Sequence, residues 1–195
     1  MTNTRAHVLR TLGIISCLLL VFNTAQAQEL KLQNNQSSLT IAGTSNLHDW
    51  TIDAEKQAGF LVFNNLETGD LEKCAITIDV KGLESGKNAM NKNTYEALNY
   101  DDYKTITFNL TTVNETTSKG NNVYLVRTKG HLFIAGVKKE IDLDLTMTIL
   151  GHQVTLEGEK PLKMTDYNVE PPKALFGTVK TGDEVVISFK NKFSI

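Results

Sequence analysis

The fold class of this chain is clearest in residues 140–149, which read Glu140-Ile141-Asp142-Leu143-Asp144-Leu145-Thr146-Met147-Thr148-Ile149. Polar and apolar residues alternate through this stretch without a break. An extended strand with this sequence has one apolar side and one polar side. The pattern is typical of an antiparallel sheet whose one face is buried and whose other face is solvated. We interpret Asp142 and Asp144 as part of the solvated face, although two carboxylates on one face could also mimic a glycosidase pair.

The same alternation recurs along most of the chain, in residues 39–42, 50–54, 74–80, 105–110 and 185–189. Gly120-Asn121-Asn122 and Gly151-His152 predict tight turns, and all three prolines (161, 171 and 172) are expected in one irregular stretch. Residues 28–36 predict an edge strand or a loose lead-in. Many strands joined by short turns fit a sandwich or a barrel, and closure into an antiparallel barrel would remove exposed edges.

Residues 85–100 differ from the rest because their apolar side chains recur at helical spacing. Met90, Thr94 and Leu98 lie on one side of this pattern, with charged residues between them. The segment predicts one short amphipathic helix, which could cap an open end of the barrel.

The N-terminus predicts a secretory signal peptide over residues 1–27. Arg5 and Arg10 precede an apolar run, and Ala25-Gln26-Ala27 offers the small residues that a signal peptidase reads. We therefore expect cleavage after Ala27 and a periplasmic or secreted protein. The segment Ile14-Ile15-Ser16-Cys17 resembles a lipobox, which would make Cys17 a lipid anchor, but the cysteine lies within the apolar run.

Residues 28–195 then form a single domain large enough for a sizeable core. Removing two Arg residues and no acids lowers the net charge from −2 to −4. The absence of a basic cluster argues against nucleic acid as a partner, and the mature sequence has no apolar run long enough for a transmembrane helix. Cys74 is its one cysteine and is expected to be buried. Monomer and homodimer both remain open.

His48 and Asp49 are the first candidates for catalysis, with Ser45 as a conceivable nucleophile in a hydrolase. Sequence neighbours on a strand point to opposite faces, however, so we favour a structural role for this pair. A metal site would have to gather the isolated residues His48, His131 and His152. No nucleotide-binding or nucleophile-elbow motif occurs. We expect no catalytic residue, no metal and no cofactor.

The apolar faces of the strands are the remaining candidate site. If the sheet closes, seven of their side chains would point into the barrel: Ile76, Ile78, Ile106, Phe108, Leu143, Leu145 and Met147. A barrel of about eight strands is either filled by side chains or holds one small ligand. We expect Trp50, the only tryptophan, to pack at one end of the lumen, with Met90 and Leu98 of the helix forming a lid.

Several motifs, in order along the chain, resemble those of the YceI-like family of exported, lipocalin-like barrels. Gly43-Thr44-Ser45-Asn46-Leu47-His48-Asp49-Trp50 resembles the early signature of one branch. The family's helix is similar to residues 90–98 of this chain. The Y-P-x-I-x-F strand that follows it is similar to Tyr103-Lys104-Thr105-Ile106-Thr107-Phe108, with Lys104 where proline is common. Residues 132–141, 163–169 and 182–185 resemble later motifs, and Asn168 replaces a glycine there. Asparagine is the next best residue at positive φ.

This resemblance implies an extended antiparallel barrel of about eight strands, whose apolar lumen holds a long isoprenoid chain in some members. It implies no catalytic residue, and His48-Asp49-Trp50 departs from the signature of the isoprenoid-binding members. We therefore expect an exported, non-enzymatic protein that holds a lipid-like or isoprenoid-type molecule. The alternatives are a cell-envelope stress or interaction protein without a small ligand, and a hydrolase using His48 and Asp49.

Overall fold

The computed structural model describes residues 29–174 and 177–195, so the predicted signal peptide and Cys17 lie outside the described residues. Its strands are β1 (Glu29–Leu32), β2 (Ser38–Ser45), β3 (Trp50–Ala54), β4 (Gln57–Asn65), β5 (Asp70–Asp79), β6 (Leu83–Glu84), β7 (Thr105–Gly120), β8 (Val123–Ile134), β9 (Val137–Leu150), β10 (Gln153–Lys163), β11 (Lys173–Ala174) and β12 (Val179–Ser194). The helices are α2 (Asn88–Ala97) and the 3₁₀ turns η1 (Asn34–Gln36), η2 (Val80–Gly82) and η3 (Met164–Tyr167).

The strands close into an antiparallel barrel of eight strands, as predicted. Two of the eight are interrupted: η1 separates β1 from β2, and Glu55-Lys56 separate β3 from β4. β12 pairs with β10 on one edge and with both β1 and β2 on the other. β1 also pairs with β4, so the prediction of an edge strand or loose lead-in here is wrong. These first residues complete the ring of hydrogen bonds.

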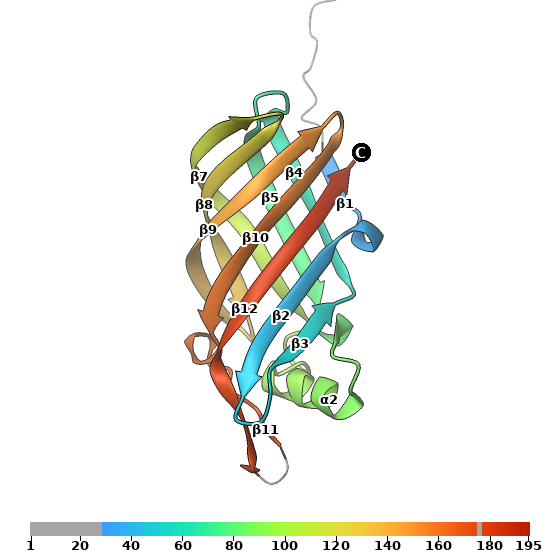
Figure 1. The fold of residues 1–195 in the computed structure, drawn as a ribbon, viewed down its shortest axis with the longest axis vertical. Coiled ribbons are helices and arrows are strands. Elements are labelled where there is room, and N and C mark those ends of the chain that lie inside the picture. Colours follow the sequence, from blue (N-terminus) through green and yellow to red (C-terminus); the bar gives the residue numbers. More distant parts are fainter. Residues whose placement is uncertain (1–28, 175–176) are drawn as a thin grey trace, which may run out of the picture.

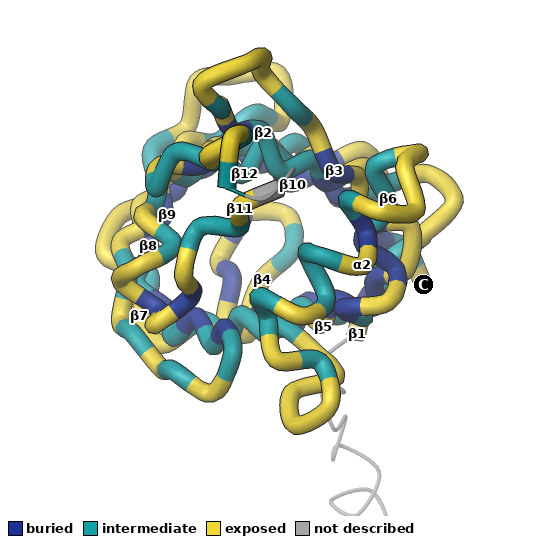
Figure 2. Tube along the Cα trace, turned by 90° about the horizontal axis from the view of Figure 1, so that it is seen from below, coloured by how far each residue is buried: buried dark blue, intermediate teal, exposed yellow. Residues whose placement is uncertain are grey.

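The helix α2 lies across one end of the barrel, beside the β2–β3 turn and β11, and the C-terminus lies at the other (Figure 1). We call these the helix end and the far end. Viewed from the helix end, the strands form a ring (Figure 2). The predicted helix is present and is shorter than expected at both of its ends. The Tyr95 hydroxyl anchors it by donating to the carbonyl of Leu83 at 3.1 Å.

The interior is divided along the barrel axis. Toward the far end, one packed cluster contains Leu30, Leu61, Met147, Val154 and Phe193, each at most 1% exposed. Toward the helix end there are two smaller clusters. One contains Ile52 and Leu83, and the other contains Tyr167 and Val169. Half-buried residues of α2 pack against both. The far half of the barrel is therefore filled by its own side chains.

Several turns carry residues in the left-handed conformation. The predicted Asn121-Asn122 turn is confirmed, with φ of 52° and 60°. Asn168, at the predicted glycine-like position, has φ of 56°. Pro161 differs from the prediction, because it lies inside β10 and not in an irregular stretch. It sits beyond Gly158, the last residue of β10 that pairs with β9, so no ladder bond to β9 is lost there.

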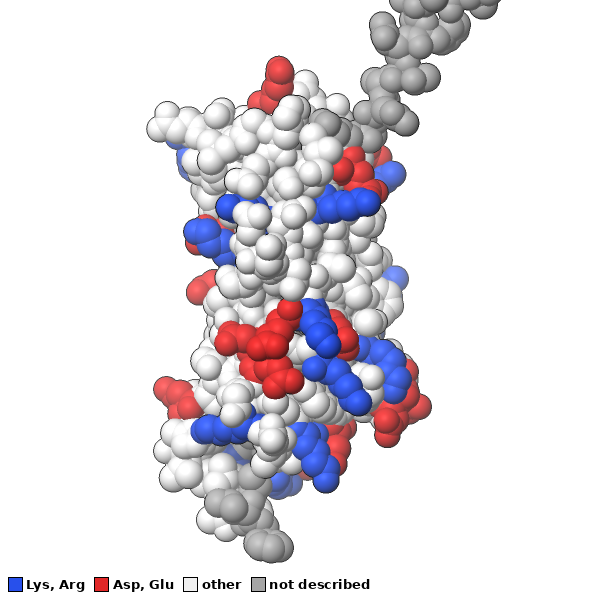
Figure 3. Space-filling view, turned by 90° about the vertical axis from the view of Figure 1, so that its right-hand side faces the viewer, with Lys and Arg blue, Asp and Glu red and all other residues white. Residues whose placement is uncertain are grey.

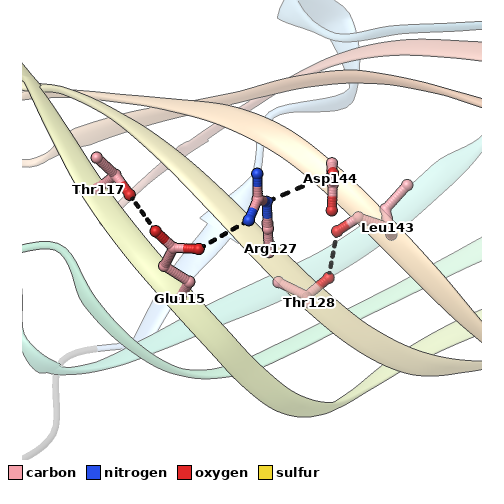
Figure 4. Close-up of polar contacts among 6 residues, drawn as sticks. All are labelled: Glu115, Thr117, Arg127, Thr128, Leu143 and Asp144. Atoms are coloured by element: carbon pink, nitrogen blue, oxygen red, sulfur yellow. Dashed lines mark hydrogen bonds and ion pairs between the residues drawn. The ribbon is translucent and has the colours of Figure 1, made fainter.

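The outer face of β7, β8 and β9 carries ion pairs (Figure 4). Arg127 lies 2.9 Å from the Glu115 carboxylate and 3.9 Å from that of Asp144, and Lys129 lies 3.9 Å from Asp142. Asp142 and Asp144 thus lie on the solvated outer face, as we interpreted them. Figure 3 shows acidic and basic side chains beside one another on the face that it presents.

Candidate functional site: an apolar cavity at the helix end

A cavity of about 380 Å³ opens at the helix end of the barrel. Its walls come from alternating residues of the strands, because inward-facing side chains recur at every second position. β2, β3, β7 and β12 contribute Ile41, Ile52, Ile106 and Ile187. The strands thus build a largely aliphatic wall, open toward α2.

Trp50 forms one side of the cavity and is fixed in place by the strand beside it. Its indole Nε1 donates to the carbonyl of Thr44 at 3.0 Å. The ring lies over Gly43, where an added Cβ would stand only 2.2 Å from Cζ2 of Trp50. Gly43 and Trp50 are also paired across β2 and β3. The glycine therefore gives the indole room to lie flat against the wall.

The helix α2 covers part of the opening with its inner face. Met90, Ala97 and Leu98 line the cavity. The helix is anchored by Asn91, a buried residue whose Nδ2 donates to the Glu84 carboxylate of β6 and whose Oδ1 accepts from the Ser85 amide at 2.8 Å. The helix is thus held firmly to β6 while its small and apolar residues face the cavity.

The last residues of β10 and the segment after it form the remaining wall. Leu162, Tyr167 and Val169 line the cavity, and Tyr167 is 2% exposed. Asp183 on β12 holds this segment by accepting from the Thr165 amide at 2.9 Å and hydroxyl at 2.7 Å. These hydrogen bonds lower the pKa of the Asp183 carboxyl, since they favour its ionised form.

The structure brings four of the ten predicted ligand residues to this cavity: Trp50, Met90, Leu98 and Ile106. The other six lie elsewhere. Leu143, Leu145 and Met147 belong to the packed far cluster, Ile76 and Phe108 pack against it, and Ile78 is buried in the cluster around Leu83. All six belong to the packed interior and lie outside the lining of this cavity.

Sequence reasoning missed several lining residues. Ile41, Ile52 and Ile187 stand in strands whose alternation was evident, and the pattern could have found them. Leu162, Tyr167 and Val169 come from the proline-containing stretch, which has no period to indicate a buried face. The placement of Tyr167 and Val169 depends on a tertiary contact, the clamp from Asp183 to Thr165, whereas Leu162 is placed by its pairing with Val185 of β12.

The catalytic candidates at the β2–β3 turn are engaged with the main chain. The Ser45 hydroxyl donates to the His48 carbonyl at 2.7 Å and accepts from the His48 amide at 3.1 Å. His48 Nδ1 lies 2.8 Å from the main-chain oxygen of Asp49, so the bond is to the backbone of Asp49 and not to its carboxylate. Ser45 and His48 both shape a turn at the cavity rim.

Other reactive groups also have structural surroundings. Burial raises the pKa of the Cys74 thiol to about 12, so the thiol stays neutral in the far cluster. Among residues 29–174 and 177–195, no three His, Cys, Asp or Glu side chains lie together as metal ligands would. Over the same ranges, no helix has the length and apolar character needed to cross a membrane.

A family model described as the YceI-like domain matches residues 28–193, nearly all of the chain beyond the predicted signal peptide. No curated protein matches the sequence.

Solved structures share the fold at low sequence identity. BcnA of Burkholderia cenocepacia is 21% identical, with a TM-score of 0.66 over 83% of this chain and 98% of its own. A polyisoprenoid-binding domain of Saccharophagus degradans, implicated in plant cell wall breakdown, is 16% identical, with a TM-score of 0.67 over 87% and 99%. The YceI protein of Campylobacter jejuni is 14% identical, with a TM-score of 0.58 over 72% and 81%.

Proposed function

Because this chain belongs to the YceI-like domain family, we propose that it binds the apolar chain of a lipid-like molecule in the helix-end cavity. The observation that carries the proposal is the cavity itself, lined by Ile41, Ile52, Ile106 and Ile187 and covered by α2. Its volume of about 380 Å³ lies within the range of roughly 300–1,000 Å³ of small-molecule sites.

The binding energy would come from removing the apolar chain from water. Each buried methylene contributes about 0.8 kcal/mol, so a chain of moderate length gives substantial affinity without a charged pocket. The wall is preformed by strands that the barrel holds on both sides, which limits the entropy lost on binding. The filled far half sets the length of chain that can enter.

Trp50 provides a direct test because it is the only tryptophan of the sequence and lines the cavity. Titration of the full mature chain with dodecanol should change the intensity or wavelength of its fluorescence in a saturable way. Ala97→Phe should weaken this binding by filling the cavity. Glu96→Phe is the matched control, since Glu96 is exposed and outside the cavity lining. An unchanged Trp50 spectrum at saturating dodecanol would contradict the proposal.

We also propose that the protein acts by binding and not by catalysis. The supporting observation is that the Ser45 hydroxyl and the His48 ring are bonded to the backbone of their own turn. Export through the predicted signal peptide remains part of the proposal. N-terminal sequencing of the protein secreted by a bacterial host should give Gln28 as the first residue.

The alternative of an interaction protein without a small ligand predicted an exposed apolar patch. Among the described residues, the most exposed large apolar side chains lie in two places, in the β2–β3 turn at one end of the barrel and at the neighbouring ends of β9 and β12 at the other. Leu47 is 66% exposed in the β2–β3 turn, and Leu150 and Ile195 are 62% and 66% exposed where β9 and β12 end. Single exposed apolar residues are normal on protein surfaces. The cavity therefore favours ligand binding.

A further inference from the structure

We infer that the ligand is an amphiphile with an anionic headgroup, a carboxylate or a phosphate, which Lys87 and His48 receive at the rim of the cavity. This inference rests on the proposed function, because the headgroup belongs to the same molecule whose chain fills the cavity.

The charge of the cavity lining carries the inference. Among the described residues that line the cavity, and apart from the phenol of the buried Tyr167, two are ionisable, Lys87 and His48, and both are basic. None of the lining residues within 29–174 and 177–195 is an aspartate or a glutamate. This is unlike the rest of the described surface, where lysine and acidic side chains pair repeatedly, as at Lys129 and Lys190. A net acidic protein thus presents a ligand site with basic groups and no acid.

Lys87 is available for a ligand. It immediately precedes α2, whose first turn contains no acidic residue. Within residues 29–174 and 177–195, no carboxylate oxygen lies within 4.0 Å of the Lys87 ammonium, whereas Lys92 on the same helix lies 3.7 Å from Glu96. Since Lys87 is exposed, its ammonium can approach a headgroup while both remain partly hydrated.

His48 contributes from the β2–β3 turn. The Asp49 carbonyl can only accept a hydrogen bond, so Nδ1 of His48 carries the hydrogen of the 2.8 Å contact. Nε2 is then the ring atom that faces a ligand, and it donates to an anionic headgroup when the ring is the doubly protonated imidazolium. The side chain of His48 is exposed at the rim and not buried among the isoleucines.

The position of these two residues fixes how the ligand enters. Burying an ionised group in an apolar interior is costly, so an anion would stay at the exposed rim with Lys87 and His48. The chain would then point inward, between Trp50 and α2, toward the packed far half. A cationic headgroup would find no carboxylate in the lining.

Ligands that share one chain and differ in headgroup test this inference. Dodecanoate, dodecyl phosphate, dodecanol and dodecyltrimethylammonium are each titrated into the mature chain, with Trp50 fluorescence as the readout. We expect the anions to bind at least about threefold more tightly than dodecanol, and the cation to bind least tightly. Comparing dodecanoate with dodecyl phosphate distinguishes the two anionic headgroups.

Single-residue variants then show which side chains produce the preference for an anionic headgroup. Lys87→Met keeps an apolar stem and should weaken dodecanoate binding by much more than it changes dodecanol binding, which removes most of the preference for anions. His48→Gln should reduce it in part. Lys92→Met is the control, since Lys92 is on the same helix but outside the cavity lining. Added salt should weaken dodecanoate binding and not dodecanol binding.

The outcomes separate the two proposals. Equal affinities for dodecanol and dodecanoate, or a Lys87→Met effect of equal size on both, would overturn the anionic headgroup and leave chain binding intact. Failure of all four ligands to bind would overturn the proposed function and this inference together.

Discussion

Trp50 and Gly43 show how one residue pair sets the shape of the site. The indole can lie against β2 only because residue 43 has no side chain, and its Nε1 is satisfied by Thr44. The signature that suggested a catalytic His-Asp pair thus has its clearest structural role in the glycine and the tryptophan at its two ends.

Gly43→Ala tests that role. The new Cβ would stand 2.2 Å from Cζ2 of Trp50, so the ring must move, and we expect a loss of about 1–3 kcal/mol in the free energy of unfolding. Urea denaturation followed by circular dichroism measures it. Thr44→Ala, at the exposed neighbouring position, is the control. Equal stability of Gly43→Ala and the parent would show that the indole is not confined as described.

The Cys74 thiol should be inert in the folded protein. Its pKa is raised to about 12 by burial, so almost no thiolate exists at pH 8. We expect no reaction of the mature chain with Ellman's reagent until urea unfolds it, and then one thiol per chain. Rapid labelling under native conditions would contradict the packed far cluster.

Asp183 should titrate below the ordinary carboxyl range. Because hydrogen bonds from Thr165 lower the pKa in the folded state, their contribution to stability is present above the ordinary carboxyl pKa. It is lost as the pH falls through the lowered folded value. Carbon-13 NMR of the side-chain carboxyl measures the titration. Thr165→Val should raise the pKa of Asp183, and an unchanged value would contradict the clamp on η3.

Among the elements, the β8–β9 turn brings together two of the family motifs, residues 132–141 that contain the turn and residues 103–108 that begin with Tyr103. Ala135 and Gly136 have φ of 46° and 81°, and an added Cβ on Gly136 would stand 2.3 Å from Cζ of Tyr103. Tyr103 precedes β7, so it packs on the turn of the neighbouring strand pair. The tyrosine and the glycine are distant in sequence and specify one contact.

Substitutions in this turn should have opposite effects. Ala135→Gly should stabilise the protein by up to about 1 kcal/mol, because alanine is strained at positive φ. Gly136→Ala should destabilise it by more than about 1 kcal/mol through both strain and the contact with Tyr103. Thermal unfolding of both variants checks the signs, and a stabilising Gly136→Ala would contradict the turn geometry.

The elements themselves were largely predictable from local patterns. The alternation around Leu143 predicts a strand and its buried face, and the spacing of Met90 and Leu98 predicts the helix. The pairing of β1 on both of its edges was not predictable, since its polar and apolar residues alternate over only four positions. β1 is a strand because β4 and β12 both offer it hydrogen-bonding partners.

At the scale of the whole molecule, the interior has a filled far half and a hollow helix end. Alternation identifies which face of a strand is inward, but not the height of a residue along the barrel axis. Met147 and Ile106 were therefore both predicted to face a ligand in the lumen. In the structure Met147 is fully buried in the far cluster, and Ile106 lines the cavity. Height follows from register and from loops that pack over the end, such as the one carrying Tyr167.

We propose that a ligand chain occupies only the helix end of the barrel. Methyl NMR of the mature chain, recorded with and without dodecanoate, tests it most directly. We predict saturable shifts at Ile41, Ile52, Ile106 and Ile187, and unchanged signals at Leu61, Met147 and Val154. Shifts centred on Met147 and Val154, or none at the four isoleucines, would contradict the account.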